Sequence, residues 1–126
     1  MSKEQEKGAY TIETENKIGE VRIADEVVAV IAGLAATEVE GVASMAGNMT
    51  RELISKLGMR NLSKGVEVEV IDSTVSVKLS LNIQYGYSVP DVSEKVQDRV
   101  KTAIENMTGL EVLDVNITIA GVNMDN

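Results

Sequence analysis

The chain has 126 residues and a formal net charge of −8 at pH 7, with 44% hydrophobic residues but only 2% aromatic residues. This length suits a single domain, and the acidic balance argues against nucleic acid as a partner, because binding to phosphates depends on Lys and Arg. Cysteine and histidine are both absent. Disulfides, thiolate nucleophiles and the commonest general base are therefore excluded, and we expect no cofactor and no metal.

Residues 1–18 are rich in Glu, Lys, Thr and Asn, a composition that predicts a flexible N-terminal tail. Within it, Tyr10, Thr11 and Ile12 suit a short edge strand if a neighbour supplies the ladder. The mixed-charge start has no apolar segment behind it, so no secretory signal is expected. The longest apolar run, 27–36, is shorter than the ~20 residues that span a bilayer. We therefore expect a cytoplasmic protein with no direct membrane span.

A helix is predicted over residues 25–38, after a short strand at 20–23. Asp25 and Glu26 lie where the first turn of a helix favours negative charge, and Gly41 ends the segment. Its larger apolar residues recur at helical spacing and its other side is small, which predicts burial on most sides: Val27, Val30, Ile31, Leu34 and Ala35 against Ala29, Ala32 and Ala36. A short strand at 42–46 follows.

A basic segment then departs from the acidic balance of the chain. It comprises a predicted short helix, which Gly58 ends, and the loop after it, and it carries Arg51, Lys56, Arg60 and Lys64. Scattered surface cations that aid solubility are one interpretation. The other is a contact site, and we take these four residues as the candidate partner-binding residues.

From residue 66 the apolar period changes to two, which predicts a hairpin of strands 66–71 and 75–84. A two-residue turn at 72–73 would place Val70 opposite Val75 and Glu67 opposite Lys78. Glu67 and Glu69 share a face and are the carboxylates best spaced for a hard cation. A solvated outer face with Lys78 as cross-strand partner is the favoured interpretation, and no metal site is predicted.

The clearest predicted helix covers residues 90–107. Pro90 suits the first helical position, and the apolar residues repeat at helical spacing until Gly109: Val92, Val96, Val100, Ala103, Ile104 and Met107. Strand 112–120 then completes a β-α-β unit. The predicted fold class is α+β, a two-layer sandwich of a mixed sheet with a C-terminal β-α-β unit and helices on one face. Whether strand 66–71 lies between the parallel strands or outside them is open.

The predicted organisation is therefore a flexible tail over residues 1–18, a single domain over 19–122 and a short C-terminal tail over 123–126. Several segments of that domain, in order, resemble the alkaline shock, or Gls-type general stress, protein family: GEVRIADEVV at 19–28, KGVEVEV at 64–70, YGYSVP at 85–90 and MTGLEV at 107–112. The stretch VEGVASMAGN at 39–48 is most similar to the YqhY-like branch. Asp25 stands where relatives often have Pro, and both suit a helix start.

The resemblance implies a protein of mainly Gram-positive bacteria in the envelope stress response, without known catalytic residues. In some branches it implies a link to fatty-acid and phospholipid supply, and some members reach the membrane through a separate membrane-embedded partner. We therefore expect a non-enzymatic interaction protein for envelope and lipid homeostasis. Its expected partners are proteins, such as a membrane-embedded anchor or a lipid-synthesis enzyme, and self-association into a homo-oligomer is left open.

Two other functions remain open at this point. One is a small-molecule or acyl-ligand binding regulator of fatty-acid synthesis, which would use the Val- and Met-rich interior and needs apolar walls with a few convergent polar groups. The other is a nucleic-acid regulator, for which the basic segment is the sole basis.

Overall fold

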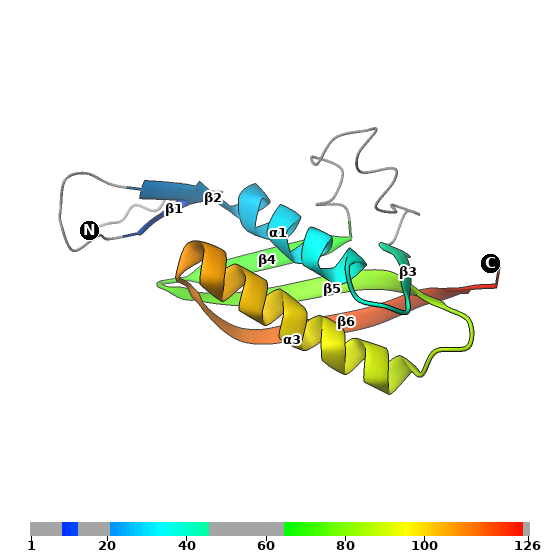
Figure 1. Ribbon diagram of the computed structural model, residues 1–126. Helices are drawn as coiled ribbons and strands as arrows, with labels where there is room; N and C mark the ends of the chain where they lie inside the picture. Colours follow the sequence, from blue (N-terminus) through cyan, green and yellow to red (C-terminus); the bar gives the residue numbers. More distant parts are fainter. Residues whose placement is uncertain (1–8, 13–20, 46–64, 125–126) are drawn as a thin grey trace.

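The structure, a computed structural model, describes residues 9–12, 21–45 and 65–124, and a long central strand organises its sheet (Figure 1). This strand, β5 (Thr74–Gln84), pairs along its whole length with the parallel strand β6 (Glu111–Asn123). The antiparallel strands β4 (Val66–Ile71) and β3 (Val42–Met45) pair with successive parts of β5. Because β6 occupies one edge of β5, both β3 and β4 lie on the other. Strand β4 is thus outside the parallel pair.

Two helices cover one face of this sheet, α1 (Asp25–Thr37) and α3 (Val89–Thr108) (Figure 1). The predicted two-layer α+β sandwich with its C-terminal β-α-β unit is confirmed. A second, two-stranded antiparallel sheet joins β1 (Ala9–Ile12) to β2 (Val21–Ala24). Strand β1 lies within residues 1–18, which the sequence predicts to be a flexible tail. Its hydrogen-bonding partner is β2, the neighbouring strand that a short edge strand at residues 10–12 needs. The boundaries at 18 and 122 stay predictions, while β6 extends the predicted last strand to Asn123.

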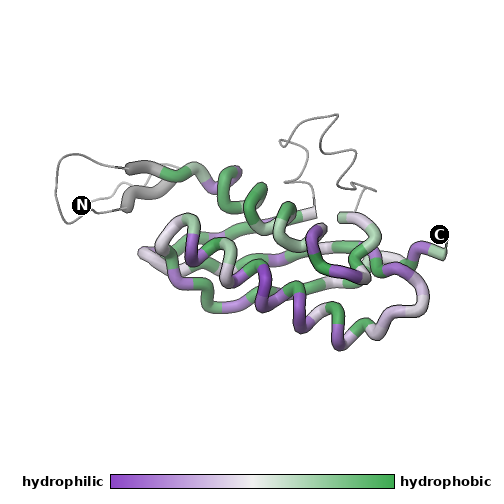
Figure 2. Tube along the Cα trace, viewed as in Figure 1, coloured by the Kyte–Doolittle hydropathy of each residue, from purple (hydrophilic) through white to green (hydrophobic). Residues whose placement is uncertain are grey.

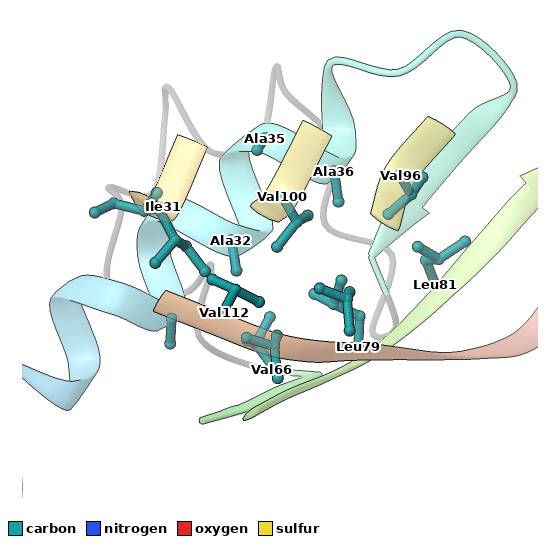
Figure 3. Close-up of a cluster of buried hydrophobic side chains, with 14 of the residues drawn as sticks. Ile31, Ala32, Ala35, Ala36, Val66, Leu79, Leu81, Val96, Val100 and Val112 are labelled. Carbon is teal, nitrogen blue, oxygen red and sulfur yellow. The ribbon is translucent and has the colours of Figure 1, made fainter. Parts of the chain in front are cut away.

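The hairpin of β4 and β5 has the predicted register, with Val70 opposite Val75 and Glu67 opposite Lys78. Asp72 in its turn has a φ of 56°, a conformation in which Asp and Asn are among the more tolerant side chains. Side chains alternate along β5, so one of its faces points at the helices. All five apolar side chains on that face are buried: Val75, Val77, Leu79, Leu81 and Ile83. Figure 3 shows this core between the sheet and the two helices.

Helix α3 begins and ends where its sequence signals predict. The Ser88 side chain accepts a hydrogen bond from the Asp91 N–H (3.4 Å), Pro90 lies in the first turn, and Gly109 ends the helix in the left-handed conformation. Polar and apolar positions alternate along this helix in Figure 2. Its buried stripe runs at intervals of four residues through Val92, Val96, Val100, Ile104 and Thr108.

Two residues predicted to lie on buried faces are exposed. Met107 is 69% exposed, because the stripe of α3 continues to Thr108, whose hydroxyl donates to the Ile104 carbonyl (2.6 Å). Val27 is 48% exposed, because α1 turns Val28 and its alanines, not Val27, toward the core. The assignment of Val27 and Met107 to buried faces was therefore wrong.

Candidate functional site

One end of the sheet brings together segments that are far apart in the sequence. The carboxyl ends of β5 and β6, the first turn of α3 and the connection from α1 to β3 all meet there (Figure 1). The Gln84 N–H donates to the Gly41 carbonyl (2.8 Å), and the Tyr85 N–H donates to the Asn123 carbonyl (3.0 Å). In sheets with parallel strands, the carboxyl ends are the usual place for binding sites, so this end of the sheet is a candidate site.

The loop that leaves β5 carries two of the chain's three aromatic residues, Tyr85 and Tyr87. Gly86 between them has a φ of 100°, a conformation that favours glycine, and it lets the chain turn toward α3. Tyr85 is 65% exposed and Tyr87 is 41% exposed. Although the chain has no Phe or Trp for its core, these two aromatic side chains lie at the surface.

Three further apolar side chains are exposed at the same end, namely Val89 in the first turn of α3 and Val122 and Met124 at the end of β6. We call the five residues Tyr85, Tyr87, Val89, Val122 and Met124 the tyrosine surface. Tyrosine and methionine are enriched at protein interfaces, because they offer large contact areas with little loss of entropy. Exposed apolar residues that gather in one place are typical of interaction sites.

The Tyr87 ring is held in a defined position. Its hydroxyl donates a hydrogen bond to Glu40 Oε2 (2.9 Å), in the connection that follows α1. The ring also lies against Gly41, where an added Cβ would be 2.9 Å from Tyr87 Cδ2. The Glu40 carboxylate raises the pKa of Tyr87, chiefly by accepting this hydrogen bond and also by repelling the phenolate. The phenol therefore stays protonated at neutral pH and remains a donor.

A second link joins the same connection to α3. Arg99 forms an ion pair with Glu38 Oε1 (2.9 Å). Both side chains are partly exposed, so this ion pair adds little to stability. It links the residue that follows α1 to α3, two residues before Glu40.

Two hollows flank the sheet at other places. One, of about 680 Å³, lies between α3 and the start of β6, and the other, of about 630 Å³, lies on the uncovered sheet face beside Glu67 and Lys78. Both linings are mainly polar or charged. Within the described ranges, no group of three or more acidic residues is placed to hold a metal ion, and Glu67 and Glu69 lie on the exposed face.

Within residues 9–12, 21–45 and 65–124, no helix is both long enough and apolar enough to cross a bilayer.

The predicted partner-binding residues Arg51, Lys56, Arg60 and Lys64 lie outside the residues that the structure describes. Their role stays a prediction. The tyrosine surface was missed as a site, although the sequence contains a signal for it: the chain has only three aromatic residues, and two of them flank one glycine just before Pro90. The end of β6 beside this loop could not be foreseen without the pairing of the strands.

Comparison with known proteins places this fold in a family. The model of the family of alkaline shock protein 23, described as having a cell envelope-related function, matches residues 13–124. YqhY of Bacillus subtilis is 39% identical over 108 residues, covering 86% of this chain and 80% of that protein. A protein of Streptococcus pyogenes named stress response regulator gls24 homolog is 30% identical over 105 residues, covering 82% of this chain and 59% of its own length.

Among solved structures, a variant of the MamM CTD superposes with a TM-score of 0.50 at 11% sequence identity, covering 79% of this chain and 96% of that chain. At this identity the likeness concerns the fold alone.

Proposed function

Because the chain belongs to the family of alkaline shock protein 23, which has a cell envelope-related function, we propose that it acts in envelope homeostasis under stress as a non-enzymatic protein that binds a protein partner. The observation that carries this proposal is the tyrosine surface. Its two tyrosines are exposed although the chain has few aromatic residues to spare for its core, and Tyr87 is oriented by Glu40. A surface of this composition suits a protein partner.

Several features support a binding function over catalysis. The sequence has no histidine or cysteine, and the Tyr87 phenol on the tyrosine surface stays protonated at neutral pH because its hydrogen bond to Glu40 raises its pKa. The relatives that match include one named as a stress response regulator homolog, which suits a protein that acts through others. We place it in the cytoplasm, with any access to the membrane supplied by a membrane-embedded partner or by a lipid-synthesis enzyme that it contacts.

A small-molecule or acyl-ligand binding regulator of fatty-acid synthesis is the alternative. An acyl chain needs a mainly apolar pocket, whereas the two hollows beside the sheet have polar and charged linings. The alternative therefore draws no support from them.

We include the basic segment in this proposal, as a second site that contacts the partner. Arg60 and Lys64 would steer an acidic partner toward an otherwise acidic protein, because charges at the rim of an interface mainly speed association. The tyrosine surface would then provide the apolar centre of the interface.

The test is affinity recovery of partners by the full chain in its native cell, with quantification by mass spectrometry. We expect Tyr85→Ser with Met124→Ser to lower recovery of the main partner at least about tenfold, since anchors of this kind contribute 1 kcal/mol or more each. Arg60→Glu with Lys64→Glu should lower recovery mainly at low salt, while each change alters stability by less than about 0.5 kcal/mol.

A matched control removes equally exposed apolar side chains at the other end of the molecule. Ile71 is the last residue of β4 and Met107 lies near the end of α3, and they are 60% and 69% exposed. Ile71→Ser with Met107→Ser should leave recovery unchanged. If this control lowers recovery as much as the Tyr85 and Met124 pair, or if no partner is recovered reproducibly, the proposed function is contradicted.

A further inference from the structure

The outer edge of β6 is a second candidate binding site, separate from the tyrosine surface. Among the strands that the structure describes, β6 pairs with β5 alone, on one side. An edge strand presents unpaired N–H and C=O groups, which another chain can use to add a strand.

Hydrogen bonds along β6 show which way its backbone groups point. The Glu111 N–H donates inward to the Ser73 carbonyl (3.0 Å), and the Asn123 carbonyl accepts inward from the Tyr85 N–H (3.0 Å). The Val112 N–H, in contrast, donates to Glu105 Oε2 of α3 (3.0 Å), and the Val115 carbonyl accepts from Gln97 Nε2 of α3 (3.0 Å). Val112 and Val115 therefore point outward.

The register of β6 against β5 shifts twice, at Leu113 and at Ala120, each time by one extra residue in β6. Between these two bulges the strand is regular, and successive residues point their backbone groups alternately inward and outward. Since Val115 points outward, so do Ile117 and Ile119. The extra residue at Ala120 reverses the alternation for the residues that follow it. Asn123 therefore points inward, as its hydrogen bond with Tyr85 shows.

The outward groups fall into two classes. Those of Val112 and Val115 are already bonded to side chains of α3. Within the described ranges, no side chain bonds to the outward groups of Ile117 and Ile119. The uncovered part of the edge is therefore short and lies between two bulges.

The surroundings of this stretch indicate what would fit. On the helix side, Ile117 and Ile119 are partly buried apolar side chains packed against the core. On the other side, Asn116 and Thr118 are exposed and polar. The neighbouring hollow between α3 and β6 is lined by three carboxylates, Glu94, Asp98 and Asp114, and by Lys95 and Lys101. Lys101 is already paired with Glu105 (3.0 Å), which leaves the hollow acidic.

We propose that β6, between its bulges, accepts an extended segment of a partner protein as an added strand, and that this segment alternates apolar with basic side chains. The main-chain hydrogen bonds of Ile117 and Ile119 supply affinity, and the two faces of the strand supply the alternation. Apolar side chains extend the helix-covered face, while Lys or Arg side chains on the opposite face meet Asp114, which shares that face with Asn116 and Thr118. This goes beyond the proposed function, which does not depend on it.

The test uses a synthetic probe, a capped heptapeptide in which valine and lysine alternate, titrated into the full chain and followed by the backbone amide signals. We expect the largest changes at Ile117 and Ile119. Two control peptides have matched chemistry: one has the same composition with valines and lysines in separate blocks, and one is N-methylated on the amides of one edge. Loss of two hydrogen bonds should weaken binding about tenfold or more.

Variants of the chain test the same contact from the other side. Proline is tolerated where the N–H of an edge strand faces outward, so Ile119→Pro removes one donor without a bond to β5. Ile119→Ala is its control, because it shortens the side chain and keeps the N–H. The proline variant should bind the alternating peptide about fivefold to tenfold more weakly than the alanine variant, and Tyr85→Ser with Met124→Ser should bind it normally.

Several outcomes would overturn the inference. Equal binding of the block peptide or of the N-methylated peptide would show that no strand is added, even if Ile119→Pro fails to fold. Signal changes confined to other residues would place the site elsewhere. A doubled mass in sedimentation that Ile119→Pro abolishes would assign the edge to a second copy of this chain instead of a partner segment.

Discussion

Gly41 decides how closely the connection after α1 can approach the tyrosine surface. Its φ of 101° lies in the region that favours glycine. A Cβ at this position would meet Val92 Cγ2 at 2.6 Å and Tyr87 Cδ2 at 2.9 Å. The missing side chain thus lets Tyr87 and the first turns of α3 pack directly on the backbone.

We predict that Gly41→Ala destabilises the chain more than Gly86→Ala does. Both glycines have φ near 100°, but nothing lies within 4 Å of a Cβ at Gly86. Backbone strain alone should cost about 1–2 kcal/mol at Gly86, and crowding should add about 1–3 kcal/mol at Gly41. Urea unfolding of the two variants measures the difference. Equal costs would mean that Val92 and Tyr87 move aside freely.

At the scale of elements, Glu105 connects α3 to β6. Its carboxylate accepts hydrogen bonds from the Val112 N–H (3.0 Å) and from Lys101 Nζ (3.0 Å). The Val112 N–H lowers the pKa of Glu105 most, and Lys101 lowers it further. The charged form is therefore favoured in the folded chain, and Glu105 fixes the first residues of β6 to the last turns of the helix.

This lowered pKa predicts a pH dependence. A carboxyl group whose pKa is lower in the folded chain stabilises the fold above its unfolded-state pKa, and this stabilisation is lost as the pH falls through the folded-state value. Unfolding free energies of the native chain and of Glu105→Gln should therefore differ at neutral pH and converge in acid. A difference that stays constant with pH would show that the charge of Glu105 does not contribute.

At the scale of the whole molecule, the two sheets have separate roles. The four-stranded sheet and its two helices hold the buried core, which includes Val100 with no exposed area. Within the described residues, β1 pairs with β2 alone, in a sheet separate from the four-stranded one. Strand β1 is therefore peripheral to the core.

We predict that deleting residues 1–17 shifts the Tm by less than about 4 °C, the shift that about 1 kcal/mol produces in a domain of this size. The deletion removes β1 but leaves β2, α1 and the core sheet. Val100→Asp is the contrasting variant, and it should unfold the chain because an unpaired buried charge costs several kcal/mol. A large fall in Tm on deletion would show that β1 stabilises the core.

The sequence alone determined the parts of the fold that depend on local chemistry. The period of two in the apolar residues of β4 and β5 predicted their register, because a shift by one residue would expose every apolar side chain. The spacing of Val92, Val96 and Val100, with Pro90 and Gly109 at the ends, predicted α3. These signals act between neighbours in the chain, so no knowledge of distant contacts was needed.

Tertiary structure decided what lies at the surface. Helix α1 is apolar on nearly all sides, so its sequence did not show that Val28 would face the core and Val27 the solvent. The bulges of β6, the outward direction of Ile117 and Ile119, and the meeting of Tyr85 with the end of β6 depend on the pairing of β5 with β6. Such contacts join segments distant in sequence, and local periodicity carries no information about which segments will meet.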